Sequence, residues 1–181
     1  MQGFVNLAAD IGVALAVLIP TICYLMGGGL LIAALFGFWQ QSKPGSEASR
    51  HPFLPWAALF TSATLLSYDR MLTFANNSFG GGVSASLSGN LTTYAPATVN
   101  AATMMGATPE DTLLNIIAAF EYFFKAYGAL IVLFGVLGLY HLSKGNRHHH
   151  HTLAKPMVQI VFGIAVMNVQ SIAPVVMGYF A

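Results

Sequence analysis

The stretch that decides the fold is IGVALAVLIPTICYLMGGGLLIAALFGFW, residues 11–39, followed directly by QQSKPGSEASRHP, residues 40–52. The first part holds no charged residue, and the second is short, polar and mostly basic. A helix rises about 1.5 Å per residue, so the apolar part exceeds the ~30 Å of a bilayer's hydrocarbon core. It must tilt, project or bend, and Pro20 offers a kink. We therefore expect a helix that crosses a membrane.

Composition supports this class. Apolar residues make up 56% of the 181-residue chain and charged residues only 7%. Soluble domains carry about 25% charged residues. A water-soluble globular domain is therefore a poor interpretation of this sequence.

The distribution of charge predicts an orientation. A second basic stretch, HLSKGNRHHHHTLAKP at 141–156, resembles the one at 40–52, and together they hold all 6 histidines and most of the lysines and arginines. Short loops rich in Lys and Arg are retained on the cytoplasmic side of a membrane. We expect both basic stretches inside the cell, in a bacterial inner membrane, with both termini and residues 76–108 on the periplasmic side.

Three further apolar runs follow the first, at 53–74, 109–142 and 157–180. Thr108 can cap the run at 109–142, where Pro109 suits the first helical position. Pro174 is expected to break the last run.

These runs predict an all-α integral membrane protein with four transmembrane helices, arranged as two helical hairpins with basic cytoplasmic loops. The first hairpin comprises residues 1–75, an extracytoplasmic linker 76–108, and the second hairpin 109–181.

The two hairpins resemble copies of one unit. Shifting the first by 101 positions places Gly27 on Gly128 and Gly37 on Gly138. Beyond the basic stretch we expect an offset larger by three, which places Pro52 on Pro156. Chance similarity remains the alternative to a duplication. Small residues allow close helix packing in lipid, and the glycines expected to provide it are Gly27, Gly37, Gly128, Gly138 and Gly163.

Glu121 and Lys125 lie one helical turn apart within an apolar run, so we expect them to form an ion pair. Charges near a membrane interior are costly and often functional. A small oligomeric ion or proton channel that uses this pair, with Asn168 and Gln170, is therefore the alternative function.

Catalytic signatures are lacking in the sequence. The tetrad His148–His151 has no neighbouring cysteine or carboxylate to complete a metal site, so a solvated basic loop is expected there. We expect a non-enzyme with no metal and no cofactor other than a bound phospholipid.

Three dispersed segments carry a resemblance to a known family. They are YLMG at 24–27, the run from Leu66 to Gly81, and KPMVQI at 155–160 together with Gly163, Ile164 and Asn168. In these the chain resembles the IcmC/DotE family of type IVB secretion systems, which has TraQ-type counterparts in I-type conjugation. The resemblance implies a subunit of a machine that transfers DNA or protein across the bacterial envelope, with other secretion-system membrane proteins as partners.

The hairpins also resemble conjugative pilins, in which two apolar helices flank a basic turn. We expect a self-associating structural subunit, a homo-oligomer or helical filament, that forms the conjugative pilus or its inner-membrane base. Positive charge facing the lumen would bind lipid headgroups or transported DNA, whose affinity depends on phosphate neutralisation. The residues expected in this role are Lys43, Arg50, Lys144, Arg147 and Lys155.

Overall fold

The computed structural model describes residues 2–43, 52–78, 104–143 and 153–179, and every regular element among them is an α-helix. The all-α prediction is thus confirmed for this part of the chain. Arg50, Lys144, Arg147 and His148–His151 lie outside the described residues, as does most of the predicted linker. The helices are α1 (Gln2–Gln41), α3 (Phe53–Leu66), α4 (Tyr68–Ser78), α6 (Pro109–Ala119), α7 (Glu121–Ser143), α8 (Ala154–Met167) and α9 (Val169–Met177).

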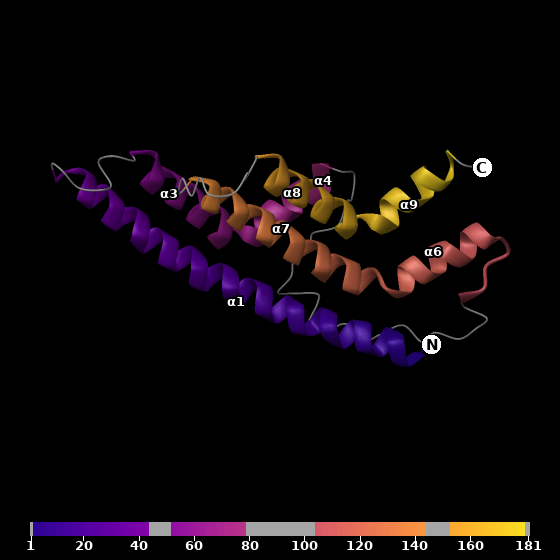
Figure 1. Ribbon diagram of the computed structural model, residues 1–181. Coiled ribbons are helices and arrows are strands. Elements are labelled where there is room, and N and C mark those ends of the chain that lie inside the picture. Colours follow the sequence, from indigo (N-terminus) through magenta and orange to yellow (C-terminus); the bar gives the residue numbers. More distant parts are fainter. Residues whose placement is uncertain (1, 44–51, 79–103, 144–152, 180–181) are drawn as a thin grey trace.

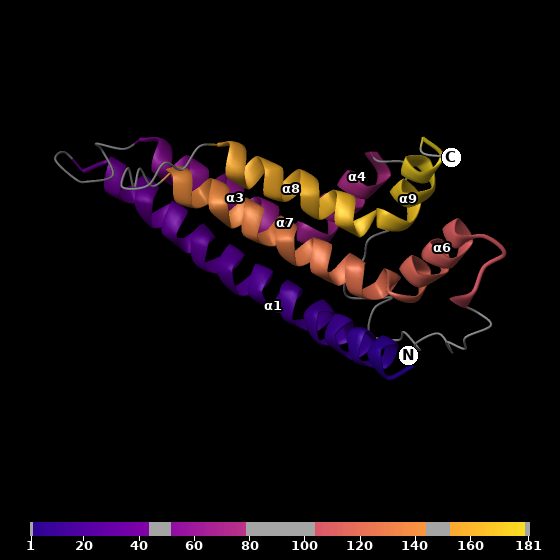
Figure 2. The ribbon, with the colours of Figure 1, turned by 45° about the vertical axis from the view of Figure 1, so that its right-hand side comes forward.

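The helices form an elongated bundle around α7 (Figure 1). α7 packs most extensively against α8 and also contacts α1 and α3, while α1 packs along α3. α1 and α7 end, and α3 and α8 begin, toward the same end of the bundle, at the left of Figures 1 and 2. We call it the basic end, because the basic stretches connect the helices there. The start of α1 and the helices α6 and α9 lie toward the opposite end.

Two described helices, Gln2–Gln41 and Glu121–Leu142, are long and apolar enough to cross a membrane. α8 and α9 satisfy the same test only as a pair, which gives up to three spans. α3 is apolar but has 14 residues, about 21 Å of helix and less than the ~30 Å of hydrocarbon. A membrane protein is therefore supported, with fewer evident spans than the four predicted.

α1 is one continuous helix of 40 residues that runs through Pro20. At about 1.5 Å per residue it is roughly 60 Å long, twice the thickness of the hydrocarbon core. The possible kink at Pro20 does not interrupt the helix, so the length of α1 in a membrane is to be accommodated by tilt or by projection beyond the hydrocarbon.

Each of the other three apolar runs is interrupted at a single residue: Ser67 between α3 and α4, Phe120 between α6 and α7, and Asn168 between α8 and α9. The predicted break at Pro174 is wrong, because this proline lies inside α9. The chain instead bends by 84° between α8 and α9. Asn168 Nδ2 donates to the Ile164 carbonyl oxygen at 2.9 Å, and such a side-chain bond to the preceding turn competes with helix continuation.

The predicted start of α6 is confirmed. Thr108 Oγ1 accepts a hydrogen bond from the Asp111 backbone N–H at 3.1 Å, and Asp111 Oδ2 accepts one from the Thr108 backbone N–H at 3.1 Å. Pro109 occupies the first turn, where no intrahelical donor is needed. This reciprocal capping box satisfies two backbone donors that the helix itself leaves unpaired.

The second helix follows the same pattern in both halves, although α1 is continuous where its counterpart is divided into α6 and α7 at Phe120. α3 and α8 both have 14 residues, and both their first and their last residues are separated by 101 positions. The breaks at Ser67 and Asn168 keep the same separation. The predicted larger offset beyond the basic stretch is wrong, because Gly37 faces Pro55 and Gly138 faces Pro156. Pro55, not Pro52, is the counterpart of Pro156.

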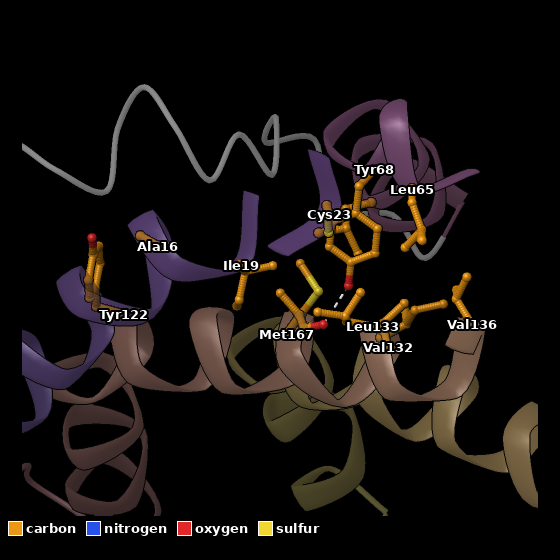
Figure 3. Close-up of a cluster of buried hydrophobic side chains, with 13 residues drawn as sticks. Ala16, Ile19, Cys23, Leu65, Tyr68, Tyr122, Val132, Leu133, Val136 and Met167 are labelled. Carbon is orange, nitrogen blue, oxygen red and sulfur yellow. Dashed lines mark hydrogen bonds between the residues drawn. The ribbon is translucent and has the colours of Figure 1, made fainter. Parts of the chain in front are cut away.

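A continuous core joins the halves. Its buried side chains come from α1, α3, α4, α7 and α8 (Figure 3). Tyr68, at the start of α4, points across this core and its hydroxyl donates to the Ala129 backbone oxygen of α7. This bond satisfies a phenol that is only 3% exposed, so the hydrogen bond offsets the cost of burying the polar group.

Candidate functional site

Two of the five predicted basic residues are described, and both are exposed near the basic end. Lys43 follows α1 and places its Nζ 3.5 Å from the centre of the Trp39 ring. Lys155 lies in the first turn of α8. A cation beside an amphipathic ring is typical of the membrane–water boundary, where the aliphatic stem lies against apolar groups and the charge stays hydrated.

Glycines lie where each hairpin's two helices approach most closely. A Cβ at Gly128 would be 2.6 Å from the Gly163 backbone oxygen, and a Cβ at Gly163 would be 2.8 Å from the Gly128 oxygen. The equivalent crossing in the first hairpin pairs Gly27 with Ser62, whose hydroxyl donates to the Gly27 oxygen at 2.8 Å. The second crossing therefore leaves no room for a side chain at Gly128, whereas at Gly27 an added Cβ would meet only the side chains of Leu65 and Leu66.

Glu121, Lys125 and Gln170 form a polar junction between α7 and α9. Lys125 Nζ forms an ion pair with Glu121 Oε1. With the Gln170 amide oriented so that its nitrogen faces the carboxylate, Nε2 donates to Glu121 Oε1 at 3.0 Å and to Oε2 at 3.1 Å. The two charged side chains are 34% and 33% exposed. The carboxylate therefore has partners from its own helix and from α9.

The junction lies about one hydrocarbon thickness from the basic end. α7 has 23 residues from Glu121 to Ser143, about 35 Å of helix. Glu121 is its first residue, so its side chain lies at the end of a helix long enough to span the hydrocarbon, which is where such a helix meets the membrane–water boundary. An ion pair at that depth retains partial hydration, which lowers the cost of the charges.

A hollow occupies the place in the first half that corresponds to the polar junction. The counterparts of Glu121, Lys125 and Gln170, 101 positions earlier, are Pro20, Tyr24 and Asp69. These three residues line a cavity of about 460 Å³. The remaining lining residues are Cys23, Leu65, Leu66, Ser67, Tyr68 and Arg70. One half thus joins its helices with polar contacts where the other leaves a partly apolar space.

The polar junction and the hollow offer helix-packing contacts and a space that a ligand could occupy. Among the described residues, no cluster of three or more His, Cys, Asp or Glu side chains forms a metal site. The polar junction pairs its charges internally. The hollow combines an apolar wall with Asp69 and Arg70, a lining suited to a lipid chain near a headgroup.

Sequence reasoning missed the buried hydrogen bonds of Ser62 and Tyr68. Both residues lie in an apolar run, Ser62 five residues before the break at Ser67 and Tyr68 directly after it. A hydroxyl within an apolar helix requires a partner, and this signal could have identified them. Their partners could not be named, since both are backbone carbonyls of other helices.

No protein-family model, curated protein or solved structure matches this chain. The fold and the site are therefore interpreted from their own geometry.

Removing one partner of the ion pair is expected to have a small effect on stability. Lys125→Met leaves Glu121 with Gln170, and partly exposed pairs contribute about 0–1 kcal/mol. We expect the thermal midpoint in detergent to fall by no more than a few degrees relative to Lys155→Met, a change at an exposed lysine. Complete loss of folded protein in Lys125→Met alone would show that the pair is essential to the fold.

Proposed function

We propose that this chain is a non-catalytic structural subunit of a type IV secretion or conjugation system. It contributes two pilin-like hairpins with four membrane crossings to the conjugative pilus or its inner-membrane base. The observation that carries the proposal is the duplicated hairpin, whose two copies turn toward the same end of the bundle. The resemblance to the IcmC/DotE family supplies the choice of machine.

In this proposal, the basic end faces the cytoplasm or the lumen of the assembly. There Lys43 and Lys155 are exposed, and Arg50, Lys144 and Arg147 belong to the same two connections. Lys and Arg neutralise phosphate, the group shared by lipid headgroups and nucleic acid. The partners in this proposal are further copies of the chain, other secretion-system membrane proteins, membrane lipids and transported DNA.

The orientation can be tested by cysteine labelling of intact cells in a Cys23→Ala background. A membrane-impermeant maleimide is expected to label a cysteine at position 85 or 107 and to spare one at 43, 45 or 146. All five positions should react after the membrane is opened. Labelling of 43 or 146 from outside, with 85 protected, would contradict the proposed topology.

The proposed role in transfer can be tested by removing the positive charges of the basic end. Replacing the five basic residues by glutamine is expected to reduce DNA or protein transfer by roughly tenfold or more, because phosphate affinity depends steeply on the number of neutralising cations. Exchange between lysine and arginine at the same positions keeps the charge and should retain transfer. The glutamine variant must keep the labelling pattern described above, since basic loops also set topology. Unchanged transfer with unchanged topology would contradict this role.

The second candidate is an ion or proton channel, favoured by the charged pair beside a helix break, where transporters often place their sites. A Glu121→Gln and Lys125→Met double variant is expected to abolish flux across proteoliposomes if the pair conducts. A structural subunit should show no flux before or after the change. The partial exposure of the pair and its bonds to Gln170 favour the structural role.

A phospholipid is the ligand proposed for the hollow beside Pro20 and Arg70. Native mass spectrometry from mild detergent is expected to show a lipid adduct that Arg70→Gln weakens, because the guanidinium would bind the phosphate. Lys155→Gln provides a matched loss of charge at the other end of the bundle. Equal adducts in both variants would place the lipid elsewhere.

A further inference from the structure

The hollow in the first half is lined by two adjacent side chains of opposite charge. Asp69 and Arg70 lie in the first turn of α4, directly after Tyr68. Both line the cavity of about 460 Å³, a volume within the usual range of ligand sites. Arg70 is exposed and Asp69 is partly buried, so the charged side of the hollow can be reached from outside the protein.

The remaining lining residues are uncharged, and several of them belong to the buried core. Cys23, Leu65 and Tyr68 are each at most 3% exposed, so packing fixes this wall of the hollow. The Tyr68 hydroxyl already donates to the Ala129 carbonyl oxygen. A charged group of a ligand would therefore be bound by the carboxylate and the guanidinium of α4.

The two charges together define the chemistry of a ligand. A guanidinium binds phosphate oxygens through charge-assisted hydrogen bonds, and a carboxylate accepts such bonds from an ammonium group. A phospholipid with a primary amine in its headgroup, such as phosphatidylethanolamine, carries both groups beside its apolar chains. Phosphatidylglycerol has the phosphate but no ammonium, and it would bring a second negative charge near Asp69. The quaternary ammonium of phosphatidylcholine has no N–H to donate.

We propose that Asp69 makes the hollow selective for a phospholipid whose headgroup carries a primary ammonium, while Arg70 binds its phosphate. This inference rests on the phospholipid proposed above for the same hollow, and it adds the class of headgroup and the residue that selects it. At the equivalent place in the second half the counterparts are Gln170 and Ser171, which carry no charge. We therefore expect one lipid of this class per chain.

The selectivity can be measured by competition between lipids. The full-length protein in mild detergent is given equal amounts of phosphatidylethanolamine, phosphatidylcholine and phosphatidylglycerol with the same acyl chains, and native mass spectrometry quantifies the adducts with one bound lipid. We expect the phosphatidylethanolamine adduct to exceed each of the others by roughly fivefold, the effect of one partly exposed charge pair. Equal adducts of phosphatidylethanolamine and either competitor would overturn the inference.

Substitutions at Asp69 test whether this residue makes the selection. Asp69→Asn is expected to remove the preference for phosphatidylethanolamine, whereas Asp69→Glu keeps the charge and should keep the preference. Asp10→Asn is the matched control, because it makes the same chemical change at an exposed position of α1 outside the hollow. A preference that survives Asp69→Asn, or that Asp10→Asn removes equally, would overturn the role of Asp69. The competition in the unchanged protein tests the headgroup class even if a variant does not fold.

The outcomes separate this inference from the proposal on which it rests. An adduct that Arg70→Gln weakens but that shows no headgroup preference would overturn the inference and keep the phospholipid in the hollow. An adduct that Arg70→Gln leaves unchanged would overturn both. The proposed role as a secretion-system subunit is measured separately, by the transfer and labelling tests above.

Discussion

Gly128→Leu is expected to prevent the second hairpin from closing. A Cβ at this position would lie 2.6 Å from the Gly163 backbone oxygen and 2.8 Å from the Met167 backbone nitrogen. Neither atom can move without shifting α8, whereas side-chain neighbours can change rotamer. Overpacking within a core costs about 1–3 kcal/mol, and contact with backbone lies at or above the upper end of that range. Folded yield and thermal midpoint in detergent measure the loss.

Two other glycines provide a graded control for Gly128→Leu. A Cβ at Gly27 would meet only side-chain atoms of Leu65 and Leu66, at 3.0–3.2 Å, so Gly27→Leu is expected to have a smaller effect. Gly29 has nothing within 4 Å of an added Cβ, and Gly29→Leu is expected to be close to neutral. Equal destabilisation by all three variants would show that helix propensity, rather than packing, determines the outcome.

Tyr68→Ala is expected to have the second largest effect, by loosening the contact between the two hairpins. It removes a buried ring from the centre of the core (Figure 3), and deletion of a large aromatic side chain costs about 3–5 kcal/mol. Tyr68→Phe keeps the ring and loses only the hydrogen bond to Ala129, a cost of about 1 kcal/mol. Unfolding by a denaturing detergent in mixed micelles measures both.

Tyr24 provides the matched control for Tyr68, since it is 59% exposed. Tyr24→Ala is expected to change stability by much less than Tyr68→Ala. Comparable losses at the two positions would contradict the central place given to Tyr68. A Tyr68→Phe variant as unstable as Tyr68→Ala would assign the effect to the hydroxyl instead of the ring.

The helical class, the membrane character and the start of α6 were predictable because they depend on local properties of the sequence. A long run without charged residues indicates a membrane helix, and Thr108 and Pro109 form a local capping signal. The breaks at Ser67, Phe120 and Asn168 were not predicted, because no proline or glycine marks these positions in the sequence. A kink was considered at Pro20 and a break was expected at Pro174, yet α1 continues through Pro20 and α9 contains Pro174.

In the repeat, too, the features that depend on local residue identity were predictable and the others were not. Gly27, Gly37 and their counterparts were recognisable because the residues are identical, so the first helix of each half was aligned correctly. Beyond the basic stretch, the dipeptides His51-Pro52 and Lys155-Pro156 are alike, and this chance similarity favoured Pro52 as the counterpart of Pro156. Only the contacts with Gly37 and Gly138 identify Pro55 instead. In the candidate site, the spacing of Glu121 and Lys125 predicted their pairing, while the contribution of Gln170 depends on the bend at Asn168.

Because α1 is unbroken, a movement of one end of this helix is coupled to a movement of its other end. A rod of about 60 Å that pivots near its middle moves each tip by roughly 5 Å when it leans by ten degrees. Lys43 lies next to one tip and the exposed Phe4 close to the other. Because α1 packs along α3 and α7, such a lean would shift the contacts of the bundle at both of its ends.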